Sequence, residues 1–225
     1  MTSLDAVGPL LRREETIAVA LLLAFGGGYL DAYTWIIHGV MANAQTANLV
    51  LLWVHGSTGD WAGALHFVPP MLAFAVGIVM AAWLRGAAGE RAVAISLLVE
   101  ILLLVAVAIL HNRLPDVAGT LGISFVAAMQ TAVFSRVEGV AYSSVMITGN
   151  MRQAIENLFA ALGGGPPGAL RRSGIFSALC VMFGIGAAVG AVATEVTPEL
   201  ALALPVVALL IVLLRCEAER RKARP

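Results

Sequence analysis

Six long apolar runs constrain this chain more than any other feature, because each is long enough to cross a lipid bilayer. A helix needs roughly 20 residues to span a hydrocarbon core about 30 Å thick. Hydrophobic residues make up 60% of the 225 residues and charged residues only 12%, against roughly 25% charged in a soluble domain. The sequence therefore predicts an all-α polytopic membrane protein. The runs cover residues 17–37, 67–84, 92–110, 117–134, 174–193 and 200–214.

The order of these runs repeats about a hundred residues later. In each half a long run is followed by a short segment with the pattern Thr-x-Asn, at Thr46-Ala47-Asn48 and Thr148-Gly149-Asn150, and then by two more long runs. Since each half holds three spans, the second half must enter the membrane from the opposite side. We therefore expect one membrane domain over residues 1–225, made of two inverted three-helix repeats, as in many transporters and channels. The repeats cover about 15–112 and 115–216, and a basic tail covers 215–225.

The positions of the basic residues predict the orientation of the chain. Cytoplasmic loops of membrane proteins hold most of the Lys and Arg. If the two short segments do not cross, every cation except Arg113 falls on the side of the two termini. If both crossed, Arg85, Arg91 and Arg136 would move outside. Six spans with cytoplasmic N- and C-termini, in a bacterial inner membrane, are therefore expected.

The two Thr-x-Asn segments carry the main functional hypothesis. Thr and Asn are preferred at helix N-termini, because their side chains accept hydrogen bonds from unpaired backbone N–H groups. Two half-helices that begin at the membrane midplane would turn their positive dipole ends toward one another and form a polar site. The alternatives are capped surface loops and, for the amphipathic second segment, an interfacial cytoplasmic helix. The expected substrate-binding residues are Asp31, Asn43, Thr46, Asn48, Gln130, Thr148, Gly149 and Asn150.

Two acids lie inside long runs. A charge at mid-membrane costs at least about 2.5–3.5 kcal/mol, so such residues usually face a cavity or a partner. Asp31 and Glu100 are therefore candidates for proton coupling, with Gln130 as the uncharged counterpart of Asp31 in the second repeat. A protonated acid that is hydrogen-bonded between helices is the alternative for each.

Other classes of site have little support in the sequence. The net charge is zero, so no nucleic-acid partner is expected. Cys180 and Cys216 have no partner at metal-ligand or redox spacing, and the four histidines form no zinc motif. No metal or cofactor is therefore expected. The Gly186/Gly190 pair and the triple glycine at residues 26–28 are typical of close helix packing, and the former also of a homo-oligomer contact.

These motifs resemble those of the YoaK family of bacterial six-span inner-membrane proteins, whose function is unknown. The resemblance covers about residues 15–215, and this chain has Ala47 where the family usually has Gly. It implies the topology and a plasma-membrane location, and it implies no substrate. The residues that carry it are 28–32, 43–48, 129–132 and 142–150.

The arrangement predicts transport of a small polar or ionic solute across the membrane, with proton coupling if Asp31 or Glu100 titrates. The lipid bilayer and the solute are then the expected partners, and no enzymatic activity is expected. Three alternatives stay open at this point. They are a passive channel, a membrane-embedded enzyme that uses the two acids and the histidines, and a non-transporting scaffold or regulatory subunit.

Overall fold

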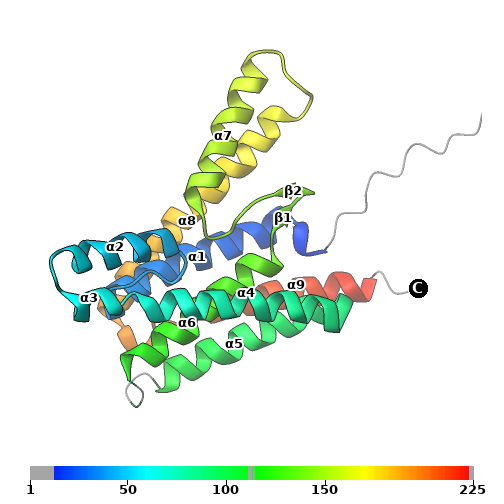
Figure 1. Ribbon diagram of the computed structural model, residues 1–225. Coiled ribbons are helices and arrows are strands. Elements are labelled where there is room, and N and C mark those ends of the chain that lie inside the picture. The colour runs from blue at the N-terminus through cyan, green and yellow to red at the C-terminus, as the bar shows by residue number, and fades with distance from the viewer. Residues whose placement is uncertain (1–12, 111–112, 114, 223–225) are drawn as a thin grey trace, which may run out of the picture.

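The computed structural model describes residues 13–110, 113 and 115–222, and most of them are helical (Figure 1). The helices are α1 (Ile17–His38), α2 (Gln45–Ser57), α3 (Trp61–Leu65), α4 (Val68–Ala88), α5 (Ala92–Leu110), α6 (Asp116–Val133), α7 (Ile147–Leu162), α8 (Ala169–Val196) and α9 (Ala203–Lys222). Short 3-10 turns are η1 (Arg13–Glu15), η2 (Gly89–Arg91) and η3 (Pro198–Leu200). One antiparallel hairpin joins β1 (Arg136–Val137) to β2 (Val140–Ala141).

Five helical stretches among the described residues are long and apolar enough to cross a membrane, which confirms the membrane class. They are Ile17–His38, Trp61–Leu110, Asp116–Val133, Ala169–Val196 and Pro198–Arg220. The second stretch is 50 residues long and contains both α4 and α5, so it includes two of the predicted runs. The largest differences from the predicted limits are at α8, which begins at Ala169 instead of residue 174, and at α9, which continues to Lys222.

Two glycines that precede the Thr-x-Asn segments have the same backbone conformation. Gly39 ends α1 with φ of 65°, and its N–H bonds the Trp35 carbonyl at 2.9 Å. Gly139 forms the turn of the β-hairpin with φ of 77°. Positive φ favours glycine at both places, because a Cβ would crowd the backbone. Each glycine therefore turns the chain at the start of the segment that leads to the motif.

The bundle is built from closely packed helix pairs. α1 packs along α8, α4 along α6, and α5 against both α6 and α9, while α9 also contacts α1. Glycines allow the closest approach of α1 and α8. A Cβ on Gly28 would lie only 2.0 Å from the Phe183 carbonyl oxygen, and a Cβ on Gly186 would lie only 2.0 Å from the Phe25 carbonyl oxygen. The expected small-residue contact is therefore confirmed. It lies within the chain, with Gly186 and Gly190 facing α1.

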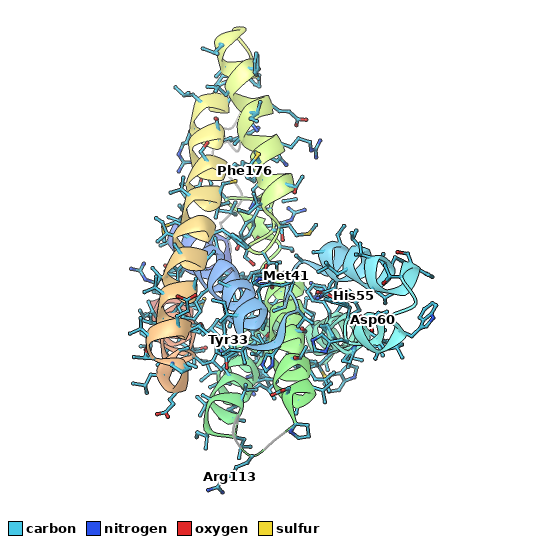
Figure 2. All side chains as sticks on the ribbon, turned by 90° about the vertical axis from the view of Figure 1, so that its left-hand side faces the viewer. Tyr33, Met41, His55, Asp60, Arg113 and Phe176 are labelled. Atoms are coloured by element: carbon cyan, nitrogen blue, oxygen red, sulfur yellow. The ribbon has the colours of Figure 1, made fainter. Side chains whose placement is uncertain are left out.

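The α7–α8 hairpin projects from this bundle (Figures 1 and 2). Phe176, which is 1% exposed, lies between the two helices (Figure 2). The Ser173 hydroxyl donates to the Ala154 carbonyl at 2.8 Å and joins the helices. Arg171 makes a two-pronged ion pair with Glu138 in the β-hairpin. The start of α8 is thus attached to the turn that follows α6.

The bundle has two distinct ends (Figure 1). We call the tail end the one that holds the start of α1, the α4–α5 turn, the β-hairpin and the end of α9. We call the far end the one that holds the end of α1, the start of α6 and η3. The two Thr-x-Asn segments lead into α2, near the far end, and into α7, in the projecting hairpin.

Candidate functional site

The Thr-x-Asn residues do not cap their helices, so that prediction was wrong. α2 begins at Gln45 and α7 at Ile147. Each motif therefore occupies the second to fourth residues of its helix. The N-cap positions are Ala44 and Met146, and neither side chain accepts a capping hydrogen bond. The asparagines fail as caps because their carboxamides are directed back to the preceding loop.

Both asparagines bind the backbone seven residues upstream. The Asn48 Oδ1 accepts the Met41 N–H at 2.9 Å, and its Nδ2 donates to the Met41 carbonyl at 2.7 Å. In the second copy Asn150 Oδ1 accepts the Ser143 N–H at 3.4 Å, and Nδ2 donates to the Ser143 carbonyl at 2.6 Å. Figure 2 places Met41 beside α1, at the base of α2. We call these contacts the Asn clamps, and they give the repeated tripeptide a structural reason.

The other motif residues lie on the outside of their helices. Thr46, Thr148 and Gly149 are exposed, whereas Asn48 and Asn150 are 0% and 4% exposed. Asn48 also donates to the Gln45 Oε1 at 2.9 Å. The structure therefore separates the two residue types of the motif. The asparagines hold loops in place, and the threonines face away from the loops.

The first loop folds back onto α1 and covers Asp31. The Asn43 N–H donates to Asp31 Oδ1 at 2.8 Å, and the Asn43 Nδ2 donates to the Gly27 carbonyl at 2.9 Å. One turn along the helix, the Thr34 hydroxyl accepts the Ala42 N–H at 3.1 Å. Successive backbone N–H groups form a concave surface that suits an anion. Asp31, at 8% exposed, therefore attaches the loop to α1.

The second loop reaches the same part of α1 from the other repeat. Gln130 Nε2 donates to the Leu23 carbonyl at 3.0 Å and to the Ser144 hydroxyl at 3.3 Å. A Cβ on Gly27 would lie 3.0 Å from the Ser144 carbonyl oxygen. The two loops thus meet α1 around Gly27. Asp31, Asn43 and Gln130 are brought to this region, and Ser144 is a member that sequence reasoning missed, although it lies in the second family signature.

Several buried polar atoms in the described part of the chain have no hydrogen-bond partner. They include Asn43 Oδ1, in the loop region just described, and Glu100 Oε2, in α5. Glu100 is 0% exposed, and its other oxygen accepts the Ser96 hydroxyl at 2.7 Å. No hydrogen bond between described residues joins Asp31 to Glu100. The described residues also contain no group of three or more metal-binding side chains.

A cavity of about 950 Å³ opens at the tail end. Four segments that are distant in sequence line it, namely η1, the α4–α5 turn, the end of α6 and the last turns of α9. Its charged residues are Glu14, Glu15, Glu90, Glu217, Arg85, Arg136 and Arg220. Some of these are already paired, because Arg85 donates to the Ala132 carbonyl at 2.5 Å and Arg220 to Glu217 at 3.3 Å. Sequence analysis did not predict the cavity, since no single segment forms it.

Aromatic and histidine side chains join the helices at the far end. The Tyr29 hydroxyl donates to the Ala201 carbonyl, which joins α1 to the start of α9. The His38 ring lies against Gly119 of α6, and a Cβ on Gly119 would be only 3.0 Å from the ring Nε2. The same ring packs edge-on against Tyr33. The His66 ring is 2.6 Å from the His38 carbonyl. These contacts join α1, α6 and the α3–α4 connection across the far end.

The fold and these sites define a helical membrane protein whose two loop segments meet on its first helix. The chain belongs to the family described as "Protein of unknown function (DUF1275)", whose family model matches residues 19–215. This result agrees with the resemblance seen in the sequence motifs. No curated protein and no solved structure matches the chain.

Proposed function

We propose that the protein moves a small polar or ionic solute across the bacterial inner membrane by alternating access. The observation that carries the proposal is the contrast between the two ends of the bundle. A cavity of about 950 Å³ opens at the tail end, whereas side-chain contacts through Tyr29 and His38 join the helices among the described residues of the far end. A carrier in one of its two end states has such an asymmetry. The cavity would then be the entrance, because the solute contacts proposed below are not part of its lining.

The helix packing supports six spans arranged as two inverted repeats. If the halves are exchanged, α1 corresponds to α6, α4 to α8, and α5 to α9. Under this exchange the pair α1–α8 corresponds to the pair α6–α4, and the pair α1–α9 corresponds to the pair α6–α5. In each of these four pairs the two helices pack against one another. The two Asn clamps obey the same exchange, with an equal separation of seven residues. We therefore propose that the 50-residue stretch Trp61–Leu110 crosses the membrane twice.

The basic residues support a cytoplasmic tail end. Arg85 lies in the last turn of α4, Arg91 in η2 and Arg136 in β1, and these elements meet at the tail end. Arg215 and Arg220 lie near the end of α9 there. Cytoplasmic segments of membrane proteins are enriched in such residues. In this orientation the cavity faces the cytoplasm and both termini are cytoplasmic.

The proposed solute contacts lie where the two loops meet on α1. Asn43 Oδ1 is buried and has no partner among the described residues, so it can accept a hydrogen bond from a solute. Gln130 and Ser144 supply a carboxamide and a hydroxyl from the second repeat. Asp31, Asn48 and Asn150 shape the loops through backbone contacts. The outward positions of Thr46, Thr148 and Gly149 give no support for direct solute binding by these three.

Flux in proteoliposomes tests the proposal. The purified protein is assayed against a panel of small anions, cations and metabolites. Ala94→Trp places a large ring in the cavity lining and should abolish flux, whereas Ala87→Trp, at an exposed position of α4 outside the lining, should preserve it. Absence of flux for the whole panel, or equal flux in the two tryptophan variants, would contradict the proposal.

One observation favours a second candidate, a non-transporting scaffold subunit. Gln130, Ser144 and Asn48 are each at most 1% exposed and bonded within the protein, so the region around the motifs is densely packed. The same flux assay separates the two candidates. We propose no enzymatic role, because Asp31 is occupied by the loop and shares no hydrogen bond with Glu100 among the described residues. A homo-oligomer would need a face other than Gly186 and Gly190, which pack on α1.

A further inference from the structure

We propose that Glu100 is a proton-binding site that exchanges its proton with the tail-end cavity through Ser96. The use of this site in transport rests on the function proposed above, whereas proton binding itself does not. The proposal also distinguishes between the two acids of the membrane spans. Asp31 accepts the Asn43 N–H of the first loop, whereas Glu100 Oε2 has no hydrogen-bond partner among the described residues.

The surroundings of Glu100 favour a neutral carboxyl group. Its side chain is 0% exposed in an otherwise strongly apolar helix, and within residues 13–110, 113 and 115–222 only the Ser96 hydroxyl is bonded to it. An ionised carboxylate at mid-membrane costs at least about 2.5–3.5 kcal/mol without compensation. Either a proton or a cation must therefore accompany the group. A proton needs less space in the packed core than a cation does.

The helices around α5 bring no compensating charge to this depth. The elements packed against α5 are α4, η2, α6 and α9. The buried polar groups on the middle turns of α6 are the neutral hydroxyls of Thr120 and Ser124. The charged and titratable described residues on these elements lie near their ends, and they are Arg85, Glu90, Arg91, Asp116, Arg215, Cys216, Glu217, Glu219 and Arg220.

Ser96 stands between the cavity and the acid. Val93 and Ala94 line the cavity, and Glu100 lies seven residues beyond Val93, or about 10 Å along the helix at 1.5 Å per residue. Ser96 lies one turn beyond Val93, and it is 0% exposed. Its hydroxyl donates to Glu100 Oε1 at 2.7 Å. A protonated water in the cavity can give a proton to Ser96 Oγ while the hydroxyl proton passes to Oε1, so one O–H bond forms for each that breaks.

Labelling with a hydrophobic carbodiimide tests this site without any transport measurement. The reagent adds to a protonated carboxyl in apolar surroundings, and mass spectrometry then identifies the modified residue. The protein is placed in sealed vesicles of known orientation, with the pH on each side set independently. Glu100 should be labelled at low cytoplasmic pH, and labelling should be lost as the cytoplasmic pH rises. A change of the external pH should have no effect, and Glu100→Gln should abolish the adduct.

Two serine variants provide the matched comparison. Ser96→Ala removes a hydrogen bond that a carboxylate would accept, so the pH of half-labelling should rise by about one to two units. Ser173→Ala removes a buried hydroxyl of the α7–α8 hairpin, which is bonded to the Ala154 carbonyl and lies outside the elements packed against α5, and should leave the profile unchanged. Labelling that is absent, independent of pH, governed by external pH, or unaffected by Ser96→Ala would overturn the proposal. The expected labelling without pH-dependent flux would leave the proton site intact and exclude coupled transport.

Discussion

The Asn clamps make a direct prediction about the repeated motif, which is that its asparagines are structural and its threonines are not. Asn48→Ala removes the two bonds to Met41 and the bond to Gln45. Each bond contributes about 0.5–1.5 kcal/mol net, so the three together contribute about 1.5–4.5 kcal/mol. Alanine regains about 0.6 kcal/mol of helix propensity. The free energy of unfolding should therefore fall by about 1–4 kcal/mol.

Unfolding of the purified protein in detergent, followed by circular dichroism, measures this loss. Thr46→Ala is the matched control, because Thr46 is exposed two residues away in the same turn. It should change the free energy of unfolding by no more than about 0.5 kcal/mol. The second copy repeats the comparison, with Asn150→Ala destabilising by about 0.5–2.5 kcal/mol for its two bonds after the same correction for helix propensity, and Thr148→Ala neutral. Equal effects of the threonine and asparagine variants in both copies would refute the clamp reasoning.

Three further predictions concern packing, a loop and a buried hydroxyl. Gly28→Ala should lower the free energy of unfolding by about 2–3 kcal/mol in the same assay, because the new Cβ meets the Phe183 backbone. Gly26→Ala should be neutral or stabilising, because the space around Gly26 is open. Similar values for the two variants would contradict the α1–α8 contact. Two hydrogen bonds lower the pKa of Asp60, the larger effect coming from the Gly63 N–H and the smaller from His55. The ionised Asp60 therefore stabilises the α2–α3 turn at pH values above the ordinary Asp pKa, and this stabilisation is lost as the pH falls through the lowered pKa. Amide exchange of Gly63 should accelerate there in the natural protein but show no such step in Asp60→Asn, and an unchanged exchange profile in the variant would count against it. Tyr142→Phe should leave the melting temperature unchanged or raise it, because the buried hydroxyl has no partner among the described residues, and a clear drop would reveal a missed contact.

Much of the helical framework could be predicted from the sequence, because membrane spans depend on local apolar content. The run at residues 92–110 coincides with α5, and the first run differs from α1 by one residue at its end. The start of α8 was placed too late, because Arg171 and Arg172 interrupt the apolar run. The helix nevertheless begins at Ala169, since α7 packs beside this part of α8 and Arg171 pairs with Glu138.

The candidate site was predicted less well. Asp31, Asn43 and Gln130 do lie where the two loops meet α1. The capping role of the motifs was wrong, since a carboxamide seven residues from a backbone group can reach it only if the intervening chain turns back. That reversal lies in residues 42–47 in one copy and in residues 144–149 in the other, so it requires a particular fold of the loop in front of each helix. Preference for Thr and Asn at helix starts is a local statistic and cannot describe this longer-range contact.

The sequence by itself determined the membrane class of this chain, where its apolar helices lie, and that a Thr-x-Asn pattern occurs twice, because these properties depend on composition and order along the chain. The tertiary structure alone decided which groups are paired. The Gln130 bond to the Leu23 carbonyl joins residues 107 positions apart, and the tail-end cavity is formed by four separate segments. Such contacts depend on how packed helices bring distant backbone groups together, and glycines such as Gly28 permit that packing without specifying the partner.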